Sequence, residues 1–263
     1  MNMQTSASPA RVYDQHFVPA LFQYWGDYLA NTANIKSGQQ VLDVACGTGV
    51  LACAVAERIG EKGEVVGLDL NNDMLDVARS KNTSIVWRDG QAESLPFGNN
   101  SFDHVMSQFG FMFFSDQRTA LREMMRVLRP GGHLTVAVCD AIDHSPGYAV
   151  LAELLQRLFG IEVADAFRAP FASGNQQALL SLCLRAGITH ARVERHDGPV
   201  TFPSIQSLVS TERACAWTLG GLLDEAQFDQ LYQESEEAFQ PFLTPQGEVA
   251  FNMPALVINA TKQ

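Results

Sequence analysis

The chain has 263 residues, of which 46% are hydrophobic, and 18 Lys+Arg stand against 29 Asp+Glu for a formal net charge of −11. This length and composition suffice for one large or two small domains with a substantial core, and they argue against a disordered chain. The acidic balance and the lack of a basic run disfavour a nucleic-acid partner, because such a surface repels a phosphate backbone. We therefore expect a small-molecule ligand.

The N-terminal residues lack the basic-then-apolar pattern of a signal peptide, and no apolar run approaches the roughly 18 residues of a membrane span. We expect a cytoplasmic protein without stable membrane insertion, and a homodimer stays open. The five cysteines are odd in number and form no C-x-x-C pair, which favours buried reduced thiols. No metal-ligand cluster is visible, so no metal is expected.

The first predicted elements are helical. Residues 11–34 carry aromatic and aliphatic side chains at helical spacing around Pro19, which predicts one or two amphipathic helices, and we expect residues 1–34 to form a lid. Strand and helix patterns then alternate. The predicted strands are residues 41–45, 64–70, 84–88, 102–109 and 133–139. The predicted helices between them are residues 50–59, 71–80 and 116–128.

This alternation predicts βαβ units, a parallel sheet and ligand binding at the carboxyl ends of the strands. The regular alternation of strand and helix patterns ends at about residue 140. Later helical patterns cover residues 145–168, 176–185, 204–219 and 223–240, and later strand patterns cover residues 188–195 and 249–260. We interpret residues 35–263 as one α/β domain with a doubly wound, mostly parallel seven-stranded sheet. Helical insertions near 145–168 and 204–240 would cover the ligand face.

A glycine turn joins the first predicted strand to its helix, and it reads Val41-Leu-Asp-Val-Ala-Cys-Gly-Thr-Gly49. Gly47 and Gly49 permit backbone angles and a close approach that a Cβ would forbid, so a ligand can pack against the main chain and the helix N-terminus. Taken alone, the turn also satisfies a relaxed dinucleotide-binding fingerprint that ends at Ala52.

Two aspartates narrow the ligand class. Asp43 lies four residues before Gly47 within the first strand, and Asp69 ends the second strand. Asp43 would meet a ligand amino group and Asp69 could accept two ribose hydroxyls, through charge-assisted hydrogen bonds of roughly 1.5–3 kcal/mol each. A pyrophosphate would meet an extra carboxylate. The pattern therefore favours a nucleoside that carries a cationic amino acid over a dinucleotide.

These residues resemble motif I of class I S-adenosylmethionine (SAM)-dependent methyltransferases. Four later segments are similar to the family's motifs in the same order: residues 67–74 (GLDLNNDM), 87–97 (WRDGQAESLPF), 101–109 (SFDHVMSQF) and 121–132 (LREMMRVLRPGG). The resemblance covers about residues 35–140, and the most similar subgroup is the ubiquinone/menaquinone-biosynthesis-like (type 11) small-molecule methyltransferases. It implies a Rossmann-like methyltransferase fold, SAM as cofactor and S-adenosylhomocysteine (SAH) as product.

The resemblance also implies a set of cofactor contacts. They are Asp43, Ala45, Gly47, Thr48, Gly49, Asp69, Leu70, Met74, Gln91, Ala92 and Gln108. Leu70 and Met74 would flank the adenine, and Gln108 would lie near the sulfonium and the substrate. Gln91 stands where much of the family has an aspartate that accepts from the adenine amino group, so that contact would be uncharged here.

Few residues suggest the chemistry beyond the cofactor. Methyl transfer from a sulfonium is an in-line displacement in which alignment can contribute ~7–11 kcal/mol, and a general base is needed only if the nucleophile's proton leaves early. The candidate bases are His144, after the fifth predicted strand, and His16, on the N-terminal helix, and each has a solvated or structural role as its alternative. The candidate substrate contacts are Tyr13, Phe17, Trp25, Arg213 and Trp217.

Three functional hypotheses follow. The first is a SAM-dependent methyltransferase that acts on a C, O or N atom of a small, hydrophobic or aromatic metabolite. The second is a SAM-binding protein of the same fold with a non-methylating activity, such as a cyclase or a binding module. The third is a nicotinamide-dependent oxidoreductase, which Asp43 and the Arg129-Pro-Gly-Gly132 turn argue against.

Overall fold

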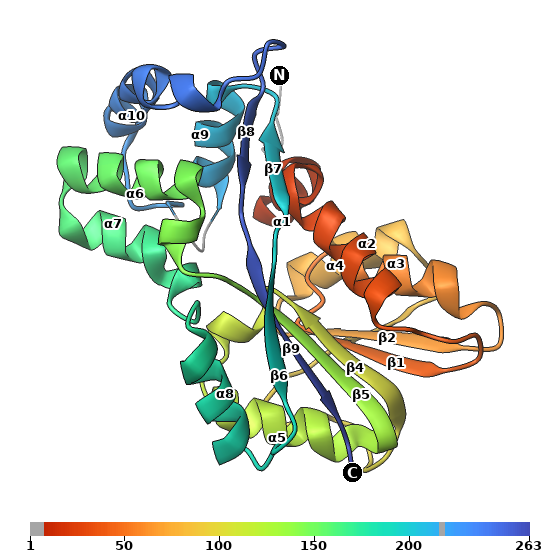
Figure 1. The fold of residues 1–263 in the computed structure, drawn as a ribbon. Coiled ribbons are helices and arrows are strands. Elements are labelled where there is room, and N and C mark those ends of the chain that lie inside the picture. Colours follow the sequence, from red (N-terminus) through yellow and green to blue (C-terminus); the bar gives the residue numbers. More distant parts are fainter. Residues whose placement is uncertain (1–7, 216–218) are drawn as a thin grey trace.

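The computed structural model describes residues 8–215 and 219–263. Its central feature is a seven-stranded sheet in the order β3-β2-β1-β4-β5-β9-β6 (Figure 1). The strands are β1 Gln40–Val44, β2 Glu64–Asp69, β3 Val86–Asp89, β4 Phe102–Gln108, β5 Leu128–Cys139, β6 Arg192–His196 and β9 Ala255–Thr261. The first five pair in parallel, and β9 runs antiparallel to β5 and β6. The predicted doubly wound, mostly parallel sheet is confirmed.

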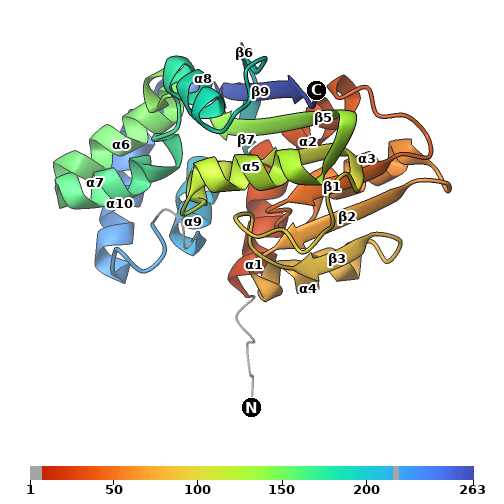
Figure 2. The same cartoon turned by 90° about the horizontal axis from the view of Figure 1, so that it is seen from below.

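Helices cover both faces of this sheet. Helices α2 (Gln23–Thr32), α3 (Val50–Ile59) and α4 (Asn72–Lys81) lie on one face, and α5 (Gln117–Val127) and α8 (Gln176–Arg185) lie on the other (Figures 1 and 2). Each face carries its own apolar cluster of strand and helix side chains. Burial on both faces explains why the central strands read as continuous hydrophobic runs rather than alternating patterns.

The N-terminal segment is one continuous helix with a widened middle. α1 (Pro9–Val12) leads into a π-helical segment, η1 (Tyr13–Phe22), and then into α2. Pro19 lies inside the π-helical segment and is exposed to solvent. A π-helical segment of this length is unusual, since such windings are mostly single turns and are frequent at functional sites.

A second layer lies beyond the carboxyl ends of the strands, and we call it the cap (Figure 1). It consists of α6 Pro146–Phe159, α7 Ile161–Arg168, α9 Ile205–Ala214, α10 Glu225–Ala238 and the antiparallel pair β7 Pro199–Phe202 and β8 Val249–Asn252. Gly160, with φ at +92°, separates α6 from α7 where the sequence suggested one helical run. One apolar cluster joins the cap to the N-terminal helix through residues such as Phe17, Leu21 and Trp25.

The later strands differ from the prediction in their bounds, and one strand was not predicted. The run predicted over residues 249–260 divides into β8 and β9 at Met253-Pro254, and the two halves join different sheets. β7 was not predicted, and β6 begins at Arg192 rather than at Ile188. Short 3-10 turns complete the fold: η2 Phe111–Phe113, η3 Ile142–His144, η4 Ala169–Phe171 and η5 Gln240–Phe242. Within the described residues, no helix combines the length and the apolar character needed to cross a membrane.

Candidate active site

A cavity of about 1080 Å³ lies between the sheet and the cap. It opens at the carboxyl ends of β1, β2 and β4, where the strand order reverses between β1 and β4. Open α/β sheets bind ligands at such a switch point. This volume lies just above the roughly 300–1,000 Å³ of usual ligand sites, which is enough to hold more than a small cofactor fragment. The elements around it divide the cavity into a half lined by the sheet and a half lined by the cap.

The glycine turn lines the sheet half. Ala45, Gly47 and Gly49 all adopt positive φ, at +58°, +54° and +85°. A Cβ on Gly47 would meet nothing within 4 Å, so that backbone faces open space in the cavity. A Cβ on Gly49 would instead lie 2.4 Å from Cη2 of Trp87. Gly47 therefore leaves room for a ligand, whereas Gly49 leaves room for packing between α3 and β3 and does not line the cavity.

Asp69 holds this turn in place from the end of β2. Its Oδ2 accepts the Gly47 N–H at 2.8 Å and its Oδ1 accepts the Asn71 N–H at 2.8 Å. Asn71 in turn caps α4, where its side chain accepts from the N–H groups of Asp73 and Met74. Burial raises the pKa of Asp69, and the backbone hydrogen bonds offset part of that rise. Each carboxylate oxygen can still accept a further hydrogen bond.

Asp43 is the most enclosed acid of the sheet half, with 1% of its surface exposed. Its Oδ2 accepts the Ala52 N–H at 3.1 Å, while its Oδ1 has no hydrogen-bond partner. Burial raises the pKa of this carboxyl well above its ordinary range, the Ala52 N–H lowers it in part, and the charge of Asp69 raises it further. A buried carboxylate oxygen without a donor is costly, so this position is suited to a ligand that brings a positive charge.

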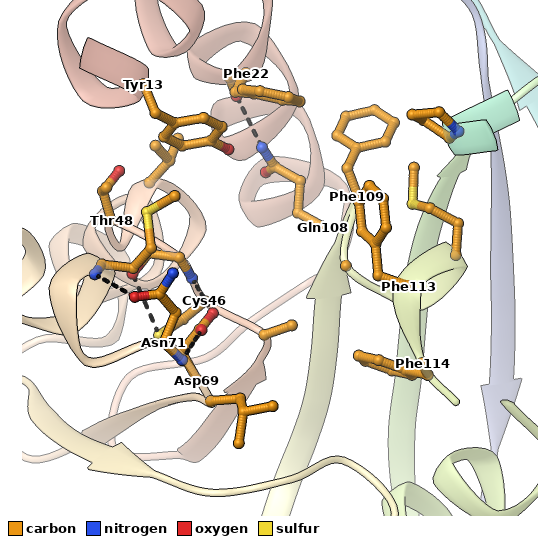
Figure 3. A pocket seen from close by; sticks show the side chains of 18 of the residues that line it. Tyr13, Phe22, Cys46, Thr48, Asp69, Asn71, Gln108, Phe109, Phe113 and Phe114 are labelled. Atoms are coloured by element: carbon orange, nitrogen blue, oxygen red, sulfur yellow. Dashed lines mark hydrogen bonds between the residues drawn. The ribbon is translucent and has the colours of Figure 1, made fainter. Parts of the chain in front are cut away.

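Aromatic rings from the N-terminal helix and from Phe109, directly after β4, lie beside these acids. The ring centroids of Tyr13 and Phe22 lie 5.2 Å apart, and those of Phe22 and Phe109 lie 5.5 Å apart. Gln108 at the end of β4 donates its Nε2 to the Phe22 carbonyl at 3.0 Å, and its Oε1 is buried without a partner (Figure 3). In the same view Phe109, Phe113 and Phe114 stand on the opposite side from Thr48. The site thus combines an amide oxygen with aromatic faces.

Twelve of the residues singled out from the sequence line this cavity. They are Tyr13, Phe17, Asp43, Ala45, Gly47, Thr48, Asp69, Leu70, Met74, Gln91, Ala92 and Gln108. Leu70 is 67% exposed and Met74 is 3% exposed, so one apolar side chain lines the cavity at the surface and the other lines it in the interior. Among the described residues, no group of three or more His, Cys, Asp or Glu side chains is arranged to hold a metal ion.

Other predicted residues lie elsewhere. His16 is exposed on the N-terminal helix, and His144 lies with its Nδ1 2.9 Å from Oδ2 of the buried Asp140, outside the cavity lining. Trp25 is fully buried in the apolar cluster beneath the cap. Arg213 pairs with an acid on α10 and lies over the ring of Phe228, 5.1 Å from its centroid. Trp217 lies outside the described residues.

The cap half contains residues that the sequence analysis missed. Tyr148, Phe167, Phe171, Glu212, Cys215 and Met253 all line the cavity. Glu212 could have been found from the sequence, because it falls on the apolar stripe of α9 that Leu208 and Val209 define, four and three residues before it. An acid on a buried stripe indicates a paired or functional group.

The sheet order and the glycine turn are those of the Rossmann-like methyltransferase fold. A solved structure from Haemonchus contortus, described as Phospholethanolamine N-methyltransferase 2 in complex with phosphomonomethylethanolamine and S-adenosylhomocysteine, shares this fold at a TM-score of 0.60. It is 18% identical, and the alignment covers 99% of this chain and 58% of that one.

Residues 15–150 match the model of the ubiE/COQ5 methyltransferase family, and the chain belongs to that family. A demethylmenaquinone methyltransferase of Staphylococcus epidermidis is 42% identical over 123 residues, which are 46% of this chain and 48% of the relative. The ubiquinone/menaquinone biosynthesis C-methyltransferase UbiE of Edwardsiella ictaluri is 40% identical over 122 residues, 44% of this chain and 49% of the relative. The chain therefore spans about half the length of these relatives.

Proposed function

We propose that this chain is a SAM-dependent methyltransferase that transfers a methyl group to a small, hydrophobic or aromatic metabolite. The observation that carries the proposal is the unpartnered Oδ1 of Asp43, a buried carboxylate oxygen beside the glycine turn at the switch point of the sheet. The α-amino group of SAM offers the positive donor that this oxygen lacks. A dinucleotide pyrophosphate would instead add a second negative charge.

The other lining residues fit the remaining parts of SAM. Gly47 lets the amino acid moiety approach the main chain, and Asp69 has acceptor positions for the ribose hydroxyls. Leu70 and Met74 offer apolar surface to the adenine ring, where the Gln91 amide oxygen stands in for the more usual aspartate. When bound, SAM supplies an electrophilic methyl group on a sulfonium.

The chain's own contribution to the reaction is alignment and exclusion of water. The rings of Tyr13 and Phe22 favour dispersed positive charge near them, and the Gln108 oxygen adds a dipole of the right sign. The apolar cap encloses the acceptor and holds it near the sheet half. Alignment of nucleophile and methyl group can supply ~7–11 kcal/mol of the barrier reduction.

We infer the chemical class of the methyl acceptor from the residues of the cap and not from the names of the relatives. The family match ends at residue 150, before most of the residues that line the cap half. The aromatic lining of that half supports a hydrophobic or aromatic acceptor. The lid role of residues 1–34, a homodimer, a cytoplasmic location and the lack of a nucleic-acid partner stay predictions from the sequence.

Calorimetric titration of the purified chain with SAM, SAH and NADH tests the proposal. We expect SAM and SAH to bind and NADH not to bind, because Asp43 meets an amino group in the first two ligands only. Methyl-labelled SAM with a pool of small aromatic acceptors should then yield SAH. NADH binding without SAM binding would contradict the proposal, and tight SAM binding with no transfer across broad pools would favour a non-methylating activity.

A further inference from the structure

Among the described residues that line the cap half of the cavity, Glu212 and Tyr148 form a polar pair between apolar side chains. Glu212 on α9 is 1% exposed and Tyr148 on α6 is 4% exposed. The two side chains share a hydrogen bond, and burial together with the Glu212 charge raises the pKa of Tyr148 well above its ordinary range. Phe167 and Phe171 line the same half, and both pack with the Tyr148 ring, at centroid distances of 5.9 Å and 5.7 Å.

The charged side chains among the described residues of the cavity lining are all acidic. The described lining includes five carboxylates and no lysine, arginine or histidine: the acids are Asp43, Asp69, Asp73, Glu93 and Glu212. The neighbouring Arg213 lies against Phe228 and its acidic partner on α10, and it does not line the cavity. An anionic group that entered the cap half would therefore meet Glu212 in a poorly solvated space whose described lining offers it no cationic side chain.

We propose that Glu212, positioned by Tyr148, is the residue that selects the methyl acceptor, and that it accepts a hydrogen bond from a hydroxyl or amino group on an aromatic ring system. This inference rests on the proposed function, since it assigns the cap half to the acceptor. A carboxylate can accept from several donors at once, so it can bind a ligand donor while it keeps Tyr148. The same charge excludes acceptors that carry a carboxylate.

Binding of naphthalene probes tests this selectivity. The probes are 2-naphthol, 2-naphthylmethylamine and 2-naphthoate, which share one ring system and present a neutral donor, a cationic donor and an anion. We expect the wild-type chain, measured by calorimetry with and without saturating SAH, to bind the naphthol and the amine at least about tenfold more tightly than the naphthoate, as a hydrogen bond to a charged group implies. Equal affinities, or no binding of either donor probe, would overturn the proposal.

The substitution Glu212→Gln keeps the shape of the side chain and removes its charge. We expect the preference for the donor probes over 2-naphthoate to fall about tenfold or more, while SAH affinity stays unchanged. Glu153→Gln is the matched control, because Glu153 is an exposed acid on the same helix as Tyr148. A preference that survives Glu212→Gln in a variant that still binds SAH would overturn the proposal.

Tyr148→Phe separates charge from shape. It removes the hydroxyl next to Glu212 but leaves the carboxylate and the ring, so the preference for the donor probes should fall, but by less than in Glu212→Gln. A larger loss of preference in Tyr148→Phe than in Glu212→Gln would show that the Tyr148 hydroxyl rather than the Glu212 charge selects the ligand, against the proposal. A wild-type chain that binds no SAH but still discriminates among the probes would defeat the proposed function and leave the Glu212 assignment supported.

Discussion

Asp69→Ala is the substitution with the most direct effect on the proposed cofactor site. Two ribose hydroxyls bound to a carboxylate would contribute about 1.5–3 kcal/mol each. Both oxygens of Asp69 already accept backbone N–H groups at 2.8 Å, and the side chain is only partly buried, so the lower end of that range applies. We expect a loss of about 3 kcal/mol, which is roughly 10²-fold in SAH affinity.

The assay is calorimetric titration with SAH, with Asp76→Asn as the control. Asp76 is an acid of α4 whose side chain is 72% exposed and pairs with Arg79. A second comparison isolates the ribose contact from the loss of turn structure. The wild-type chain should prefer 5′-methylthioadenosine over its 2′,3′-dideoxy analogue, and Asp69→Ala should bind both alike. Unchanged SAH affinity, or a variant that still distinguishes the two nucleosides, would refute the reasoning.

Three further predictions concern the turn and two buried titratable groups. Gly47→Ala should weaken SAH binding and lower the free energy of unfolding by only about 1–2 kcal/mol, because of its positive φ, whereas Gly49→Ala should mainly lower the melting temperature because its Cβ would clash with Trp87. Equal effects of the two substitutions on binding and stability would contradict this prediction. Asp43→Asn should raise the melting temperature of the ligand-free chain at pH 7 yet weaken SAH binding. The raised pKa of Asp43 means that its negative charge destabilises the fold as pH rises through that pKa, so the stability gain of the variant should vanish in acid. Burial lowers the pKa of His104 to about 4, so the unfolding free energy, followed in urea, should fall as pH drops from about 6.5 to 4, and His104→Gln should flatten that dependence.

The sheet half of the site was predictable because its signals are local in the sequence. The glycine turn, Asp43 and Asp69 lie within one βαβ unit, where strand order and crossover handedness leave little freedom in their placement. The strands and helices up to β5 were found to within a few residues for the same reason. The start of β5 was predicted wrongly. β5 begins at Leu128 rather than at His133, because residues 129–132 form a bulge between two registers with β4.

The cap half was not predictable in the same way. Tyr148, Glu212 and Met253 line one cavity only because α6, α9 and the turn between β8 and β9 fold over the sheet, and no periodicity encodes that packing. The division of the last strand at Pro254 had a local signal, since proline cannot donate to a ladder. His144 was a candidate base because it follows β5, but it pairs with the buried Asp140 and does not line the cavity.

The π-helical segment connects the two halves of the cavity. Burial raises the pKa of Tyr13, and the charges of Cys215 in the cap half and of Asp69 and Asp43 in the sheet half raise it further. The Tyr13 side chain therefore lies near both halves of the cavity. A wider helical winding projects Tyr13, Phe17 and Phe22 toward one side, where they line the cavity together. Since both halves contact the same ring, movement of the N-terminal helix on cofactor binding would also reshape the acceptor's surroundings. Cofactor and acceptor binding should therefore be coupled, and titration of either ligand in the presence of the other should show the same fold-change in affinity.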